Sequence, residues 1–122
     1  MAKKIFVTGG TGFLGAYIIS ELVQQGYNVR ALRRKQQLPF FIPKETAEKV
    51  EWVTGDILDT FSLIEAIDGV DIVVHAAAKV SFQERERKDL LRTNIDGTSN
   101  VVNVMLEKNI SRLVYISSVA AI

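Results

Sequence analysis

Three glycines at a spacing of three punctuate residues 7–15, which read Val7-Thr8-Gly9-Gly10-Thr11-Gly12-Phe13-Leu14-Gly15. A short apolar run, residues 5–7, comes before them, and an apolar pattern with helical spacing continues through residues 14–23. The glycines therefore lie between a buried strand and the start of a helix. At such a junction, free backbone N–H groups and the positive end of the helix dipole hold a pyrophosphate. This arrangement predicts a dinucleotide site.

Each glycine of the triplet has its own expected role. Gly9 makes the tight turn, Gly12 leaves room for the backbone to approach phosphate, and Gly15 lets the helix pack on the sheet. The alternative is a tight strand–helix turn that binds nothing. The cofactor-binding residues expected in this segment are Gly9, Thr11, Gly12, Phe13, Leu14 and Gly15.

Length and composition exclude several classes of protein. The chain has 122 residues, of which 48% are hydrophobic and 24% charged, as in one soluble globular domain. A net charge of +1 gives no general attraction to nucleic acid or anionic lipid. There is no cysteine and one histidine, which excludes thiolate chemistry and argues against a zinc site. Without a membrane-spanning run or a signal peptide, we expect a cytoplasmic protein.

Strand-like and helix-like periods alternate along the chain. They predict strands at residues 4–7, 28–33, 50–54, 71–75 and 112–117, and helices at residues 13–25, 60–67 and 87–108. Residues 35–49 are ambiguous, because Pro39 and Pro43 favour a loop while residues 44–49 could form one or two helical turns. Strands joined by crossovers predict an α/β fold with a doubly wound parallel sheet, in one domain over residues 1–122.

Small, polar or charged residues follow every predicted strand. After the glycine loop these are Arg33-Arg34, Gly55-Asp56, residues 75–78 (His-Ala-Ala-Ala) and Ser117-Ser118. Ligands of doubly wound sheets bind beyond the carboxyl ends of the strands, where the strand order reverses. The five strand ends are therefore expected to form one shared site.

The glycine loop and four later motifs resemble those of a known family. The later motifs are Gly55-Asp56, residues 75–78, residues 94–98 (Asn-Ile-Asp-Gly-Thr) and residues 115–118 (Tyr-Ile-Ser-Ser). Together they resemble the extended branch of the short-chain dehydrogenase/reductase superfamily, the NAD-dependent epimerase/dehydratase family, in family order. The resemblance implies a Rossmann-type sheet of about five strands that binds NAD(P).

The arginines after the second strand bear on the choice of cofactor. An acid at this place would accept bonds from the ribose 2′-hydroxyl of NAD, whereas Arg33 and Arg34 favour the 2′-phosphate of NADP. Similar dihydroflavonol reductases and hydroxysteroid dehydrogenases carry an arginine at the position of Arg34. We therefore expect NADP as the cofactor, with NAD as the alternative. If these arginines bind no ligand, they form a solvated basic loop.

Further cofactor contacts are implied by the resemblance. In similar proteins an acid at the position of Asp56 holds the adenine amino group, and the next backbone amide, here that of Ile57, lies on the ring edge. A carboxylate suits this role because it only accepts hydrogen bonds. Small side chains at Ala76, Ala77 and Ala78 would let the loop lie against ribose and phosphates. In similar proteins an asparagine at Asn94 ties the helix to this loop. The alternatives are a loop carboxylate and a surface amide.

The reactive candidate is Ser118, which in similar enzymes bonds the substrate oxygen and assists a tyrosine. Ser117 is its competitor, because a shift of one residue turns the other side chain to the site. His75 ends an apolar strand and is expected to be a satisfied core residue. Neither serine has a histidine–acid partner implied by the sequence, which gives no support to hydrolysis.

The family's Tyr-x-x-x-Lys pair does not occur in these 122 residues. The chain has three tyrosines, Tyr17, Tyr27 and Tyr115, and the residues four positions after them are Glu, Ala and Val. An unperturbed phenol has a pKa of about 10. It needs a neighbouring lysine ammonium to lower that pKa before it can act as an acid or base at neutral pH. We expect the chain to be the N-terminal part of a longer enzyme, truncated after strand five and inactive alone.

Three functions remain open at this point. The first is an epimerase or dehydratase acting on a nucleoside-diphosphate sugar. The second is an NADP-dependent reductase or dehydrogenase of the dihydroflavonol-reductase or 3β-hydroxysteroid-dehydrogenase kind, which residues 78–82 and 117–121 favour slightly. The third is a non-catalytic module that senses NAD(P).

The long helix at residues 87–108 has a wide apolar face that includes Leu91, Ile95, Thr98, Val102 and Met105. This face must cover the sheet, and similar proteins form homodimers through this helix. The expected partners are a dinucleotide, a small-molecule substrate and a possible second copy, but neither nucleic acid nor membrane.

Overall fold

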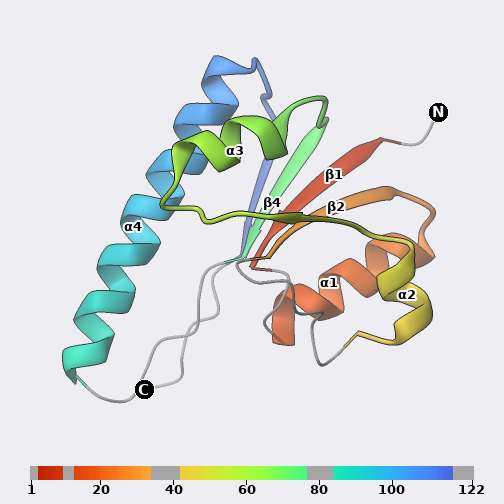
Figure 1. The fold of residues 1–122 in the computed structure, drawn as a ribbon, viewed down its shortest axis with the longest axis horizontal. Helices are drawn as coiled ribbons and strands as arrows, with labels where there is room; N and C mark the ends of the chain where they lie inside the picture. The colour runs from red at the N-terminus through yellow and green to blue at the C-terminus, as the bar shows by residue number, and fades with distance from the viewer. Residues whose placement is uncertain (1–2, 10–12, 34–41, 77–83, 117–122) are drawn as a thin grey trace.

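A computed structural model describes residues 3–9, 13–33, 42–76 and 84–116, with the backbone alone for Phe13 and residues 84–94. Five parallel strands form one sheet in the spatial order β3-β2-β1-β4-β5 (Figure 1). The strands are β1 (Lys4–Thr8), β2 (Asn28–Arg33), β3 (Glu51–Thr54), β4 (Ile72–Ala76) and β5 (Leu113–Ile116). The helices are α1 (Phe13–Gln24), α2 (Lys44–Glu48), α3 (Thr60–Ile67) and α4 (Glu84–Glu107).

The strand order reverses between β1 and β4. The chain builds outward from β1 through β2 to β3, then returns to β4 on the other side of β1. In the register of this pair, Val7 lies opposite Val74 and Thr8 opposite His75. The predicted Rossmann-type doubly wound sheet is confirmed, and its switch point lies between the glycine loop and the end of β4.

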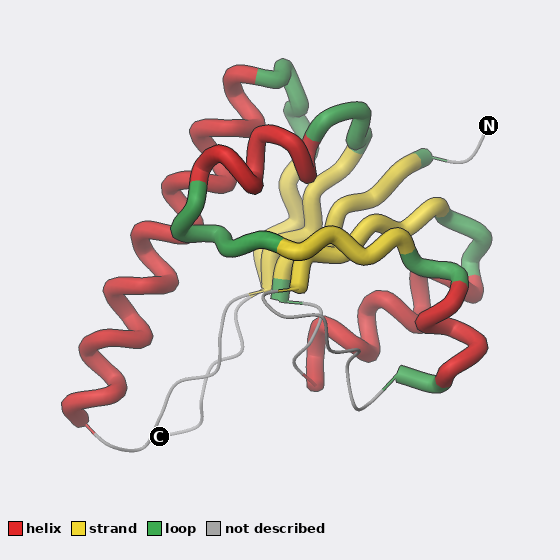
Figure 2. Tube along the Cα trace, in the orientation of Figure 1, coloured by secondary structure: helices red, strands yellow, loops and turns green. Residues whose placement is uncertain are grey.

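Two apolar layers cover the sheet, one on each face. Alternate strand residues divide between them: Ile5 and Val7 pack with α1 and α2, whereas Phe6 packs with α3 and α4. Figure 2 shows the strands between these two groups of helices. Burial on both faces explains why β1 and β4 are apolar at consecutive positions.

The predicted boundaries hold to within one to three residues. Ala76, which was expected in a loop, is the last residue of β4, and α4 begins at Glu84 instead of residue 87. The ambiguous segment contains α2, which starts directly after Pro43. Asp59 caps α3 by accepting a hydrogen bond from the Phe61 N–H.

The buried side of α4 differs from the predicted face. Gly97, Val101, Val104 and Met105 are buried, at the spacing of one helical stripe, whereas Ile95 is 65% exposed. Leu106 is likewise 68% exposed. The predicted face is confirmed at Met105 and wrong at Ile95, because apolar residues occur on both sides of the helix. Nowhere in the described ranges is a helix long and apolar enough to cross a bilayer.

Candidate functional site

Gly9 ends the segment that leads from β1 into the glycine loop, and its backbone has a φ of +71°. A Cβ at this position would lie 2.5 Å from the carbonyl oxygen of Ala76 and 3.0 Å from its Cβ. Two features therefore require glycine here: the left-handed backbone and the close approach of β4. The small residue Ala76, which is 7% exposed, permits this approach. Gly9 and Ala76 thus let the turn into the glycine loop pack directly on the end of β4, at the point where the strand order reverses.

The start of α1 lies on the same edge of the sheet. The helix begins at Phe13, directly after the glycine loop, as the phosphate site requires. Gly15 is buried, in agreement with its expected role in close helix–sheet packing. Leu14 is 37% exposed, so it lies at the rim of the domain.

Several predicted site residues lie outside the described part of the chain. These are Thr11, Gly12, Arg34, Ala77, Ala78, Ser117 and Ser118, and the side chains of Phe13 and Asn94. Their roles remain predictions.

His75 is the buried polar centre beneath the turn at Gly9. It is 2% exposed; its Nδ1 is hydrogen-bonded to the Thr8 Oγ1, and its Nε2 lies 2.8 Å from the Thr98 Oγ1. Hydroxyl groups both donate and accept, so either neutral tautomer of the ring is satisfied. Burial lowers the pKa of His75 below its ordinary value of 6.5. The prediction of a satisfied core histidine is confirmed.

The partners of His75 were not foreseen. Thr8 directly precedes Gly9, and Thr98 belongs to the motif at residues 94–98, so their positions were the available signal. Through this ring, β1, β4 and α4 are joined immediately below the glycine turn. The ring of Tyr115 on β5 stands 5.6 Å from that of His75, centroid to centroid.

The loop after β3 is braced by Ser62 of α3. The Asp56 N–H donates to the Ser62 Oγ at 3.1 Å, and the Asp56 Oδ1 accepts from the Leu58 N–H at 3.0 Å. A Cβ at Gly55 would lie 2.9 Å from the Ser62 Cβ, so the loop packs closely on the helix. This geometry fixes the backbone of Asp56 and Ile57. Contact of either residue with adenine stays a prediction.

Arg33 ends β2 beside this loop, because its carbonyl accepts from the Gly55 N–H at 2.8 Å. Its guanidinium carbon is 5.9 Å from the centre of the Trp52 ring, within the range of a cation–π contact. Trp52 is oriented by an indole N–H bond to the Ala47 carbonyl of α2, 3.0 Å long. Among the described residues, the buried Nε of Arg33 has no hydrogen-bond partner. The sequence reading missed Trp52, and no sequence signal marked it.

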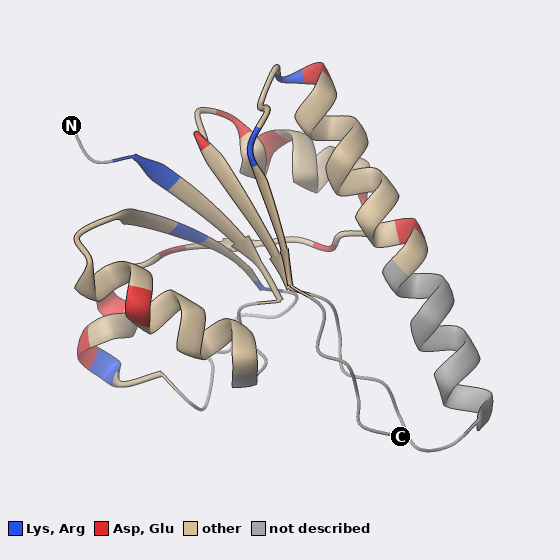
Figure 3. Cartoon of the chain, turned by 180° about the vertical axis from the view of Figure 1, so that it is seen from behind, with Lys and Arg blue, Asp and Glu red and all other residues tan. Residues whose placement is uncertain are grey.

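The carboxyl edge thus brings Gly9, His75 and Ala76 together, with Arg33 and Asp56 at the neighbouring strand ends. Figure 3 shows β1 and β4 uncharged along most of their length, with charges mainly at the starts of the strands and on the helices. Within the described ranges, no three His, Cys, Asp or Glu residues gather to hold a metal ion. Among the described residues, the site therefore offers backbone amides, small residues, the Arg33 guanidinium and the Asp56 carboxylate.

Comparison with known proteins agrees with this geometry. The model of the NAD dependent epimerase/dehydratase family matches residues 5–122. A putative dihydroflavonol 4-reductase from Synechocystis sp. is 41% identical over 122 residues, which is 100% of this chain and 34% of that protein. A decarboxylating sterol-4-alpha-carboxylate 3-dehydrogenase from Dictyostelium discoideum is 39% identical over 119 residues, 95% of this chain and 35% of that protein.

Among solved structures, a UDP-N-acetylglucosamine 4-epimerase from Bacillus cereus superposes with a TM-score of 0.75 at 33% identity. The superposition covers 99% of this chain and 39% of the epimerase. The chain spans about a third of the length of the curated relatives that it matches.

Proposed function

The chain belongs to the NAD-dependent epimerase/dehydratase family, and from this premise we propose that it is the dinucleotide-binding part of an oxidoreductase. The observation that carries the proposal is the left-handed turn at Gly9, which packs on Ala76 at the point where the strand order reverses. A bound nicotinamide would accept or supply a hydride at an alcohol or carbonyl carbon of the substrate.

Each part of the proposed cofactor site has a distinct task. The glycine loop and the start of α1 bind the pyrophosphate through backbone N–H groups. Asp56 and the backbone of Ile57 bind the adenine, and the arginines after β2 bind the ribose end. Ser118 binds the substrate oxygen. His75 is excluded as a proton donor in this scheme, because its ring is buried and both of its nitrogens are engaged.

The first test is binding itself. Isothermal titration of the 122-residue chain with NADP⁺ and NAD⁺ is expected to give saturable one-to-one binding. Gly9→Val, which would clash with Ala76 and strain the left-handed turn, is expected to abolish it. A folded wild-type chain that binds neither dinucleotide at millimolar concentration would contradict the proposal.

The cofactor preference is proposed to be NADP. Its support is the consecutive pair Arg33-Arg34 in the sequence; Arg33 ends β2 and carries a buried nitrogen without a partner among the described residues. Losing one charge-assisted contact with a phosphate weakens binding by about one to two orders of magnitude. Arg34→Ala is therefore expected to reduce NADP⁺ affinity by that factor and to leave NAD⁺ affinity nearly unchanged. An unaltered NADP⁺/NAD⁺ ratio would rule out this role of Arg34.

Catalysis is proposed to need residues beyond these 122, because a Tyr-x-x-x-Lys pair is not among them. We expect the chain alone to bind the cofactor without turning over a substrate. Spectrophotometric detection of hydride transfer by the chain alone would contradict this expectation.

Two substrate classes are supported, each by its own relatives. The reductase and the sterol dehydrogenase, at 41% and 39% identity, favour an alcohol or ketone of the flavonoid or sterol kind. The epimerase structure at 33% identity favours a nucleoside-diphosphate sugar as the second candidate. Turnover of the whole protein with a sterol alcohol and with a UDP-sugar separates the two.

Dimerisation through α4 is also a proposal. Ile95 and Leu106 are 65% and 68% exposed on this helix. Sedimentation of the wild type and of Ile95→Asp/Leu106→Asp would test it, since charges in an apolar interface favour the monomer.

A further inference from the structure

We propose that Gly97 and Asn100, on one turn of α4, are positioning residues that hold the loop after β3 in the shape that recognises adenine. The inference rests on the proposed function, because it takes Asp56 and Ile57 as the adenine contacts. It goes beyond that function by assigning base selectivity to α4. This helix would act on the base indirectly, through the shape of the loop.

Gly97 lies at the top of the buried stripe of α4, four residues before Val101. A Cβ at Gly97 would come within 2.7 Å of the Ile57 Cγ1, closer still to its Cδ1, and within 3.3 Å of its Cβ. The Ile57 side chain therefore fills the space that the glycine leaves open. Gly97 lies in the interior of the helix, so a Cβ there would disturb the seat of the Ile57 side chain and not the backbone conformation.

Asn100 holds the same residue from its backbone. Its Nδ2 donates to the Ile57 carbonyl oxygen at 2.9 Å, across 43 residues of sequence. The side chain of Ile57 is thus seated on Gly97, while its carbonyl is bound one turn further along the helix. Two independent contacts from α4 fix both the position and the rotation of the peptide unit after Ile57.

The other side of the loop is fixed by α3. Ser62 binds the Asp56 N–H, and Leu58 closes a turn onto the Asp56 carboxylate. With α4 holding Ile57, the loop is braced from both helices, which also pack against each other in one apolar cluster. A shift of Ile57 away from α4 would move its N–H relative to the Asp56 carboxylate, and adenine recognition needs the two groups together.

Base selectivity provides the test. In deamino-NADP⁺ the adenine amino group is replaced by oxygen and the ring N1 gains a proton, so donor and acceptor are exchanged. Asp56 and the Ile57 N–H would then both face the wrong partner, and the wild type is expected to prefer NADP⁺ by at least about tenfold. The ratio of the two affinities is insensitive to the folded fraction, because an unfolded chain binds neither ligand.

Asn100→Ala is expected to reduce this preference by about fivefold, and its matched control is Asn103→Ala. Both are asparagine-to-alanine changes on α4, but Asn103 is exposed and is expected to keep the wild-type ratio. Gly97→Ala is expected to reduce the preference as strongly. Adding Ile57→Ala to Gly97→Ala removes the obstructing carbons and is expected to restore part of it, which loss of stability alone would not do.

The outcomes separate this inference from the proposed function. If the folded wild type binds neither ligand, both fail. If it binds NADP⁺ with the expected preference and Asn100→Ala and Gly97→Ala keep that preference, the inference is overturned while the proposed function stands. If the wild type binds both ligands equally, Asp56 and Ile57 do not distinguish the two bases, and the inference is overturned. A reduced ratio in both variants, with the wild-type ratio in Asn103→Ala, supports it.

Discussion

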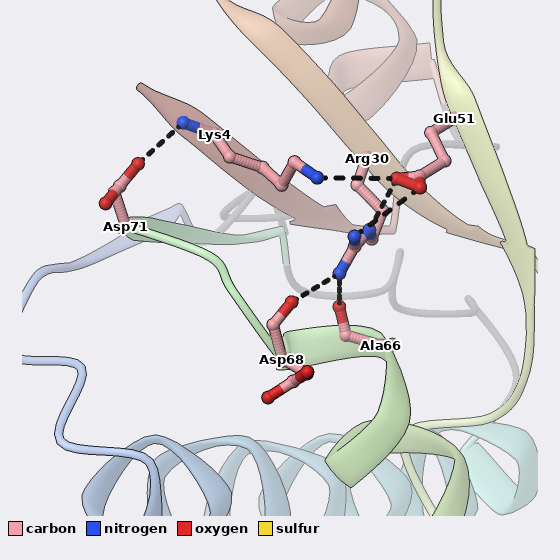
Figure 4. Close-up of polar contacts among 6 residues, drawn as sticks. All are labelled: Lys4, Arg30, Glu51, Ala66, Asp68 and Asp71. Atoms are coloured by element: carbon pink, nitrogen blue, oxygen red, sulfur yellow. Dashed lines mark hydrogen bonds and ion pairs between the residues drawn. The ribbon is translucent and has the colours of Figure 1, made fainter. Parts of the chain in front are cut away.

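The two ends of the central sheet use polar residues in opposite ways. At the amino end, Arg30 donates to the Glu51 carboxylate at 2.7 Å and to the carbonyls of Ala66 and Asp68 at 2.7 and 2.8 Å (Figure 4). Lys4 joins the same cluster through Glu51, 3.9 Å away. At the carboxyl end, the central polar group is the neutral ring of His75, between two threonine hydroxyls.

The difference follows from what each end must do. The cluster around Arg30 satisfies charges with charges and with the free carbonyls at the end of α3, so it ties helix to sheet. A negative charge beneath the glycine turn would repel an anionic ligand, and a positive charge would draw the ligand away from the backbone amides. A neutral bridge of hydroxyls and imidazole supports that turn without changing its field. We therefore expect damage at the amino end to affect stability, and damage at the carboxyl end to affect binding as well.

The largest effect is expected at Gly9. Gly9→Ala combines a strained positive φ with a contact 2.5 Å from the Ala76 carbonyl oxygen, so binding of NADP⁺ should fall by more than about 100-fold and stability by ~2–4 kcal/mol. Calorimetric titration and urea unfolding measure the two losses.

Gly26→Ala is the matched control, because Gly26 has a φ of +88° with nothing within 4 Å of the added Cβ. It should cost about 1 kcal/mol of stability and leave NADP⁺ affinity intact. Equal binding losses in the two variants would remove the distinction between the glycine turn and an ordinary helix end.

Arg30→Met comes next, with an expected stability loss of ~1–3 kcal/mol and no change in the NADP⁺ affinity of the folded chain. The Arg30 side chain is 13% exposed. Without it, the Glu51 carboxylate and the carbonyls of Ala66 and Asp68 lose their hydrogen-bond donor. Arg112→Met, at an exposed arginine, serves as the control and should change stability little. A large fall in NADP⁺ affinity with unchanged stability would contradict the separation of the two ends.

His75 should make stability depend on pH. Its pKa is lowered in the folded chain by burial, so below about pH 6.5 the unfolded chain binds more protons and folding stability falls as the pH drops. The slope is at most ~1.4 kcal/mol per pH unit and ends once the pH passes below the folded pKa. Urea unfolding between pH 7.5 and 5.5 measures it.

The comparison variant is His75→Gln, which keeps a polar side chain and cannot titrate. His75 is the only histidine of the chain, so the slope between pH 6.5 and 5.5 should be shallower in the variant. Identical slopes in the two proteins would mean that the ring takes up its proton as readily when folded as when unfolded.

The smallest expected effect concerns Glu51. Its hydrogen bond with Arg30 lowers the pKa of this carboxyl from its ordinary 4.5, so its contribution is present above that value and is lost as the pH falls through the folded pKa. The side chain is 53% exposed, and solvent screening limits the contribution to a few tenths of a kcal/mol. Glu51→Gln should therefore be slightly less stable than the wild type at pH 7, with a difference that shrinks by pH 3.5. A difference that grows on acidification would contradict this.

Much of the carboxyl end could be read from the sequence. The glycine spacing marks the turn, and the helical pattern after Leu14 marks α1, because both signals act over a few neighbouring residues. Little of the amino end was accessible in this way. Arg30 finds its partners 21, 36 and 38 residues away, and their alignment depends on the strand order and on where α3 ends.

The rotation of α4 about its axis was also not accessible from the sequence. The existence of the helix followed from composition, but its rotation did not, because apolar residues such as Ile95 and Val104 lie on different sides. Only packing against the sheet and α3 selects the side that carries Gly97 and Val104. The seat of Ile57 on Gly97 was hidden for this reason.

By itself, the sequence determined the alternation of strands and helices, the glycine turn after β1, and the buried place of His75. These follow from local backbone preferences and from the period of apolar residues. The tertiary structure decided which residues meet: Thr8 with His75, 67 residues apart, and Asn100 with Ile57, 43 apart. Such contacts depend on strand order, register and helix rotation, which are set by burial of the whole core.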